Sequence, residues 1–194
     1  MMHFRFNPER FAQALNLLLA KTGPKTHGEI CKLIYLADRE HLLKHGRPIV
    51  GGPYNALPRG PVPSFVLDTL EDLAWSTFEA QAARKQVPEE YVSFLDRYVE
   101  VRVEVPFAVY AAKPSNDMSL LSESDREIVN LISDTYGKMS FEELVELTHK
   151  HAAWRRTPRP SEIDYALFFV DSPAGKDVSE YLAMMRDEDA PVAA

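Results

Sequence analysis

Helix-capping signals recur along this chain and constrain its fold more than any other feature. A Ser, Thr or Asp that is followed three residues later by an acidic residue satisfies the free N–H groups at the start of a helix. This spacing stands at the expected start of five helices, at Thr26/Glu29, Ser122/Asp125, Ser140/Glu143, Ser161/Asp164 and Asp177/Glu180. The sequence therefore predicts a mainly α fold.

Glycine and proline mark where these helices begin and end. Asn7 followed by Pro8 is typical of an N-cap and first turn, and this helix is expected to end near Gly23–Pro24. The helix that begins after Thr26 should end at Gly46. Pro63 can open a third helix, and the helix after Ser122 should end at Gly137. Residues 76–97 have no clear assignment.

One segment has a different period. In VEVRVEV, residues 99–105, valines alternate with charged residues, which indicates a strand with one buried face. Residues 107–112 are its expected partner, with 49–50 or 54–57 as candidate edge strands. The predicted fold class is mainly α (α+β), a compact multi-helix domain with one small antiparallel β-sheet or hairpin. We expect a single domain over residues 1–186 and a disordered acidic tail over 187–194.

Composition restricts the function classes. The single cysteine, Cys31, excludes an internal disulfide and a multi-cysteine metal site. No apolar run approaches the ~18 residues of a membrane span, and the first residues lack the apolar core of a signal peptide, so a cytoplasmic protein is expected. The net charge of −7 disfavours non-specific binding of phosphates.

The connector YNALPRGPVP, residues 54–63, contains three prolines and one glycine. Proline fixes φ and removes a backbone donor, so this connector should be stiff and largely non-helical. Asp38, near the end of the preceding helix, faces it. Its carboxylate can accept backbone N–H groups or pair with Arg39 or Arg47, and we interpret it as structural. His41 falls on the apolar face of the same helix and is interpreted as buried and hydrogen-bonded.

Two alternatives to a structural role use the polar residues of this helix. His27 and Cys31 are four residues apart, so an imidazole could activate a thiolate, and Asp38 or His41 could assist in a hydrolase-like enzyme. His41 and His45 have a spacing that can hold zinc, but no Glu base lies between them. No third orienting group is apparent, and neither a cofactor nor a metal is predicted.

A DNA-binding autoregulator is a further alternative. Residues 122–151 have the outline of a helix-turn-helix, but three glutamates at the start of the second helix would repel phosphate. The local basic run of Lys150, Arg155, Arg156 and Arg159, with Trp154, is more typical of a protein-contact corner or a solvated face. Nucleic-acid binding is therefore disfavoured.

Two ordered blocks resemble a known family. KLIYLADREHLLKHGRPIVGGPYNALPRGPVPS is similar to the signature of the Panacea domain family, which includes SocA-like antitoxins and proteins described as phage-associated. Farther on, LSESDREIVNLISDTYG and SFEELVELTHKHAAW resemble its second block, a helix pair that ends in His149 with Trp154 nearby. The two blocks bracket roughly residues 7–170.

This resemblance implies an interaction protein. It would be the antitoxin of a toxin–antitoxin system, which neutralises an adjacently encoded toxin by direct contact, in one variant as an adaptor that delivers the toxin to the ClpXP protease. We place the toxin contact on the connector and the corner beside it, because Tyr, Trp and Arg dominate interface energies. The predicted contact residues are Tyr54, Pro58, Arg59, Gly60, Pro61, His149, Trp154 and Arg155. Core packing by Tyr54 and Trp154, with Arg59 merely solvated, is the alternative.

Overall fold

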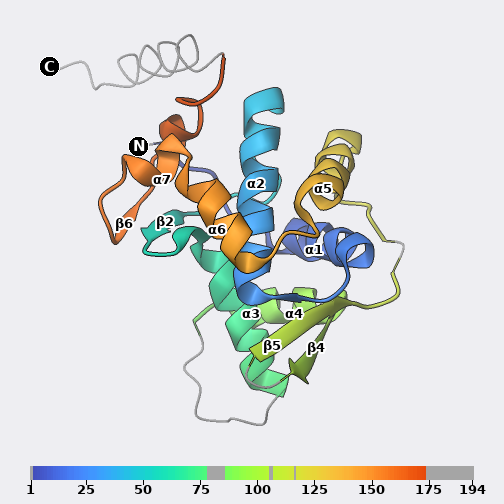
Figure 1. Ribbon diagram of the computed structural model, residues 1–194. Coiled ribbons are helices and arrows are strands. Elements are labelled where there is room, and N and C mark those ends of the chain that lie inside the picture. The colour runs from blue at the N-terminus through green and yellow to red at the C-terminus, as the bar shows by residue number, and fades with distance from the viewer. Residues whose placement is uncertain (1, 78–85, 105–106, 116, 174–194) are drawn as a thin grey trace, which may run out of the picture.

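A central helix, α2 (His27–His45), runs through the middle of the molecule and contacts α3, α5, α6 and β3 (Figure 1). The computed structural model describes residues 2–77, 86–104, 107–115 and 117–173. The other helices are α1 (Pro8–Thr22), α3 (Ser64–Thr77), α4 (Glu89–Asp96), α5 (Glu123–Tyr136), α6 (Phe141–His149), α7 (Ala152–Arg155) and the 3-10 helix η1 (Tyr165–Phe168). The strands are β1 (Lys25–Thr26), β2 (Tyr54–Leu57), β3 (Gly60–Pro63), β4 (Val99–Glu104), β5 (Phe107–Ala112) and β6 (Ser161–Glu162). The predicted fold class, mainly α with a small β component, is confirmed.

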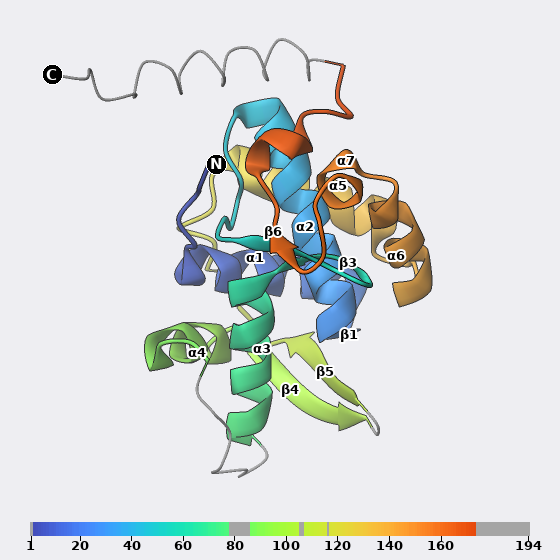
Figure 2. The ribbon, with the colours of Figure 1, turned by 90° about the vertical axis from the view of Figure 1, so that its left-hand side faces the viewer.

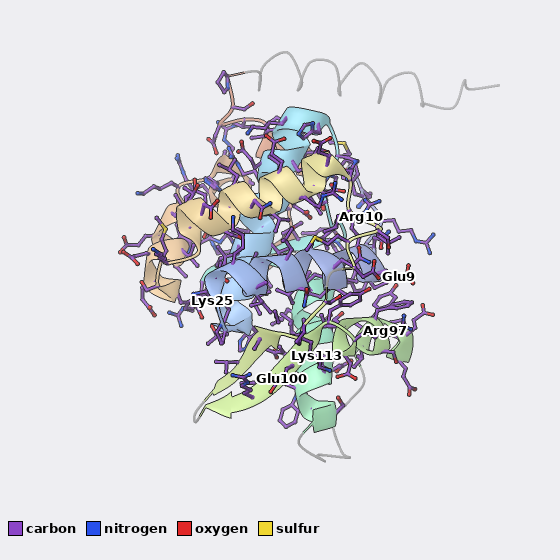
Figure 3. The ribbon with its side chains drawn as sticks, turned by 90° about the vertical axis from the view of Figure 1, so that its right-hand side faces the viewer. Glu9, Arg10, Lys25, Arg97, Glu100 and Lys113 are labelled. Atoms are coloured by element: carbon purple, nitrogen blue, oxygen red, sulfur yellow. The ribbon has the colours of Figure 1, made fainter. Side chains whose placement is uncertain are left out.

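The capping signals define most helix starts as predicted. The Thr26 hydroxyl accepts from Glu29 N, and Glu29 Oε2 accepts from Thr26 N at 2.9 Å. The boxes Ser122/Asp125 and Ser140/Glu143 close in the same way at the starts of α5 and α6. Gly46 ends α2 in the left-handed region at φ 74°, which a residue with a Cβ adopts only with strain. Figure 3 shows α1 and α5 side by side, both crossing α2.

The structure contains two three-stranded antiparallel sheets, where the sequence predicted one. In the first, β4 pairs with β5 as predicted, with Val101 opposite Tyr110. The predicted edge strands are wrong. The third strand of this sheet is β1, whereas residues 54–57 form the central strand of the second sheet, ordered β3-β2-β6, and residues 49–50 belong to neither sheet. The connector itself supplies both β2 and β3, and these two strands pair with each other as a tight hairpin.

The helix predicted from Ser161 is also wrong. Ser161 and Glu162 pair with Ala56 and Asn55 of β2, and Ile163 N donates to the Tyr54 carbonyl at 2.7 Å. The backbone groups of this segment therefore bond to a strand rather than to a helix turn. Asp164 does cap a helix, because its carboxylate accepts from Ala166 N, but that helix is η1.

Two further expectations concern the ends of the chain and the unassigned segment. Residues 89–96, within the segment that had no clear assignment, form α4. The helix expected from Asp177 and the tail over 187–194 lie outside the described residues. The single domain over residues 1–186 stays a prediction.

Candidate functional site

The Asp38 carboxylate ties the connector after α2 to the helix itself. Its Oδ1 accepts from Ile49 N at 2.9 Å and from Val50 N at 2.8 Å, and its Oδ2 accepts from Gly51 N at 2.9 Å. Oδ2 also accepts from the Tyr54 hydroxyl at 2.9 Å. Burial raises the pKa of this carboxyl, and the four donors oppose that effect. These bonds fix the path of the chain up to the start of β2.

His41 and Arg47 join the same connector to α5. His41 is fully buried, its Nδ1 donates to the Arg47 carbonyl at 2.7 Å, and its Nε2 lies 3.1 Å from Asp125 Oδ1. The Arg47 guanidinium contacts the same carboxylate oxygen at 2.9 Å. Burial alone would raise the pKa of Asp125. Hydrogen bonds from His41 and Ser122, with the Arg47 charge, hold it well below its usual range.

After the segment fixed by Asp38, β2 and β3 form a hairpin whose backbone is bonded by a side chain of α2. The Lys32 side chain is only 2% exposed, and its Nζ donates to the Pro61 carbonyl at 2.8 Å. Gly60 has a φ of 105°, and a Cβ there would lie 3.0 Å from both Lys32 Nζ and Thr148 Oγ1. The close approach of α2 and α6 to the hairpin therefore requires glycine at this position.

The other side of the hairpin is held by Trp154, which donates from Nε1 to the Leu57 carbonyl at 2.8 Å. The His149 ring stacks on the indole, with centroids 3.7 Å apart and planes 6° apart, and the Arg159 guanidinium carbon lies 3.6 Å from the indole centroid. Two groups this close to one ring centre would overlap on a single face, so they lie on opposite faces. The indole is thus fixed between His149 and Arg159.

The described residues place no hydrogen-bond partner at His149 Nε2 that could exchange a proton with it, and this nitrogen is buried. Burial, followed by the charges of Lys32 and Arg159, lowers its pKa. A neutral imidazole is therefore favoured, and it serves here as a stacking partner for Trp154.

The structure divides the predicted contact residues into a support and a surface. Tyr54, Gly60 and Pro61 are buried, so they shape the hairpin from inside. His149 and Trp154 are half-buried in the stack. Pro58, Arg59 and Arg155 are exposed. The Arg59 side chain is 64% exposed, lies 4.4 Å above the Phe141 ring and contacts Glu142 Oε1 at 3.3 Å.

Exposed cations occur at the hairpin tip, formed by Pro58 and Arg59, and along residues 150–159, the segment that contacts the hairpin through Trp154. We call this group the basic corner, and its members are Arg59, Lys150, Arg155, Arg156 and Arg159. The bond between Trp154 and Leu57 physically joins the two blocks that sequence analysis placed together, and Figure 1 shows α6 and α7 beside β2. The basic corner contrasts with the net charge of −7 over the whole chain.

Sequence reasoning missed Lys32 as part of this site. A lysine on a helix is normally exposed, so its buried position under β3 gives no signal in the local pattern. Arg159 was assigned to the basic run, but its stacking on Trp154 depends on the fold of residues 156–160 and not on spacing.

The residues proposed for an enzyme do not form a reactive group. Cys31 is buried, and burial raises the pKa of its thiol to about 12, so it is protonated at neutral pH. A cavity of about 400 Å³ opens at the start of α1, and its lining includes Asn7, Arg10 and Ile49 but none of His27, Cys31, Asp38 or His41. Among the described residues, no three His, Cys, Asp or Glu side chains are placed to hold a metal ion.

Fold and site together define a mainly α protein whose candidate site is a surface rather than a cleft. The family model of the SocA-like antitoxins, the Panacea domain, matches residues 30–155. This range is more than half of the chain and includes α2, the hairpin and Trp154, so the chain belongs to this family, and membership supports an antitoxin-type role. No curated protein and no solved structure matches the chain. Within the described part, no helix has the length and apolar character required to span a bilayer.

Proposed function

We propose that this chain neutralises a cognate toxin, encoded by a neighbouring gene, through direct binding in the cytoplasm. The contact surface would be the hairpin tip with the basic corner. The observation that carries this proposal is the anchoring of an exposed tip on both sides, by Trp154 at the Leu57 carbonyl and by Lys32 at the Pro61 carbonyl. Tyr54, Gly60 and Pro61 are buried in the hairpin, so a partner could not contact them directly.

Rigidity favours a binding role because a preorganised loop loses little conformational entropy when a partner docks. The exposed arginines add side chains that are frequent among binding hot spots. Since the corner is positive, the complementary toxin surface should be acidic, and this charge match would steer association. Within the described residues, the Arg59 guanidinium lies over the Phe141 ring and pairs with one exposed acid, Glu142, and it can exchange that ion pair for one on the toxin.

Co-expression with the neighbouring toxin tests the proposal. Arg59→Glu and Arg155→Glu should each abolish or strongly reduce growth rescue while the melting temperature stays near that of the unmodified chain. Arg97→Glu is the matched control, because Arg97 is exposed next to α4 on another side of the molecule (Figure 3). Full rescue by both corner variants would remove the corner from the interface.

Toxin abundance separates two modes of neutralisation. If the chain acts by stoichiometric binding, the toxin persists in a complex that can be purified. If it acts as an adaptor for ClpXP, the toxin half-life shortens when the chain is present, and it recovers when the protease is deleted. Binding through the corner is the shared first step, so the same two variants should impair either mode.

A further inference from the structure

A cavity of about 400 Å³ lies where the N-terminal segment enters α1. Three parts of the chain form its walls: residues 4–10, residues 47–50 and Phe94 of α4. Asn7 N donates to the Val50 carbonyl at 3.0 Å, and this bond holds the first two walls together. Figure 2 shows the N-terminal segment leading down into the first turn of α1, with α4 below that turn. The volume suits a small molecule, and the described lining includes no residue of the hairpin or of the basic corner.

The charged side chains of this lining are mostly cations. Arg5, Arg10 and Arg47 line the cavity with one acid, Glu9, and Figure 3 shows Glu9 and Arg10 at the start of α1. Arg47 is paired with the Asp125 carboxylate. The described residues place no carboxylate within ion-pair distance of Arg5 or Arg10, and Glu9 is exposed and makes no ion pair in that part of the chain. The lining is therefore positive, in a chain whose net charge is −7.

Arg10 has donor groups that the described residues leave without an acceptor. Its guanidinium makes one bond there, from Nη1 to the Ile49 carbonyl at 3.3 Å. Its Nε is buried, so water does not supply an acceptor, and no described residue accepts from it. Buried donors are normally hydrogen-bonded, so an unpaired one beside a cavity indicates a missing acceptor. Because a single long bond holds the guanidinium, a small rotation of the side chain can turn its Nε and Nη2 donors toward a ligand in the cavity.

Asn7 presents further free donors at the same place. Its Oδ1 accepts from Arg10 N at 2.9 Å, which caps α1. This bond fixes the amide and leaves its Nδ2 group without an acceptor among the described residues. The first turn of α1 adds a partial positive charge. Ile49, which is buried, and Phe94, which is half-buried, supply an apolar wall. The cavity thus combines N–H donors, positive charge and apolar surface.

We infer that this cavity binds a small organic anion, whose carboxylate or phosphate group is held by Arg5, Asn7 and Arg10 and whose apolar body lies against Phe94. A guanidinium bonds either oxyanion with two parallel N–H groups, so the two groups share one recognition chemistry. A metal ion does not fit, since the described lining offers one carboxylate and no His or Cys side chain. The site is separate from the surface proposed for the toxin.

Isothermal titration calorimetry of the purified full chain at low ionic strength tests this site, with phenyl phosphate and benzoate as probes of the two oxyanions. At least one probe should bind at a single site, and inorganic phosphate should bind more weakly because it lacks the apolar body. Asn7→Asp should weaken affinity about tenfold or more, because it replaces free donors by a carboxylate while still capping α1. Arg10→Gln should weaken affinity to a similar extent, because a bidentate contact is lost. Circular dichroism checks that both variants are folded.

Glu9→Gln tests the same site in the opposite direction. It removes a like charge from the lining and should strengthen affinity about threefold. Lys138→Gln is the matched control, because it removes an exposed cation of the turn after α5, which is not part of the lining, and it should leave affinity within about twofold. The inference is overturned if neither probe binds, if inorganic phosphate binds as tightly as both probes, or if Lys138→Gln weakens binding as much as Asn7→Asp. The assay contains no toxin, so its result is independent of the proposed function.

Discussion

The Tyr54 hydroxyl donates to Asp38 Oδ2 at 2.9 Å, and this bond joins the first residue of the hairpin to the middle of α2. Both side chains are fully buried. All four groups that contact the Asp38 carboxylate are donors, so both of its oxygens act as acceptors. The connector and the hairpin are therefore positioned by one buried residue of the preceding helix.

Asp38→Asn should destabilise the fold by roughly 1–3 kcal/mol or more, because an amide N–H₂ would face backbone donors in a buried site. Tyr54→Phe removes a single bond to the same carboxylate and should cost about 1 kcal/mol. Urea denaturation measures both. Glu40→Gln, at a half-buried position of α2 where only an i, i+4 ion pair with Lys44 is lost, serves as the control and should change the free energy of unfolding by no more than about 0.5 kcal/mol. A free energy of unfolding unchanged in Asp38→Asn would refute the anchoring role.

Local signals account for the parts of the fold that the sequence predicted. A capping box such as Thr26/Glu29 is complete within four residues, so no tertiary contact is needed to recognise it. The valines of β4 alternate because one face of the strand is buried and the other is wet, which is again local. The signals at Asn7 and Ser140 succeeded for the same reason.

The parts that failed depend on contacts between distant residues. Ser161 and Glu162 become a strand because β2 lies beside them, about a hundred residues earlier in the chain. The capping-box spacing at Ser161/Asp164 does not start a helix at Ser161, because pairing with β2 takes up the backbone groups of Ser161 and Glu162. Of the candidate site, the connector and Trp154 could be proposed from sequence, but the Lys32 contact with Pro61 and the sandwich around Trp154 could not, since spacing carries no information about either.

Lys32 should make stability depend on pH in the alkaline range. Burial, with a further contribution from Arg59, lowers the pKa of its ammonium group to about 8, from 10.5 in the unfolded chain. Between pH 8 and pH 10.5 the unfolded chain binds more protons than the folded chain, so the free energy of unfolding should rise with pH. The cost of burying the charged ammonium group of Lys32 is up to about 3 kcal/mol below pH 8, and it disappears as the pH rises to 10.5.

Lys32→Met removes that penalty together with the bond to Pro61. The free energy of unfolding of this variant, minus that of the unmodified chain, should therefore be largest below pH 8 and should decline toward pH 10.5. Lys150→Met, at an exposed position, is the matched control and should give a difference that does not change with pH. A constant difference for Lys32→Met would mean that the lysine is not perturbed by burial.

His151 should contribute to acid sensitivity. Its Nδ1 lies 3.1 Å from the Tyr35 hydroxyl, and burial, followed by the Arg39 charge, lowers its pKa to about 4 from 6.5. Between pH 6.5 and 4 the unfolded chain takes up a proton that the folded chain excludes, so stability should fall as the pH is lowered through this window. In His151→Gln this part of the acid loss should be smaller, as followed by thermal melts at several pH values. An equally steep loss in the variant would assign the acid sensitivity to other groups.

Trp154 allows the rigidity of the hairpin tip to be tested apart from its surface. Trp154→Phe keeps an aromatic ring between His149 and Arg159 but deletes the Nε1–H group that bonds the Leu57 carbonyl, so it should cost about 1 kcal/mol. Amide hydrogen exchange should then become faster between Ala56 and Gly60, and toxin affinity should fall because a looser tip loses more entropy on binding. Trp75→Phe is the matched control, because Trp75 is an exposed tryptophan of α3 and the bond to the Leu57 carbonyl comes from Trp154. Normal toxin binding by a Trp154→Phe chain whose tip exchanges faster would show that rigidity of the hairpin is not what the partner requires.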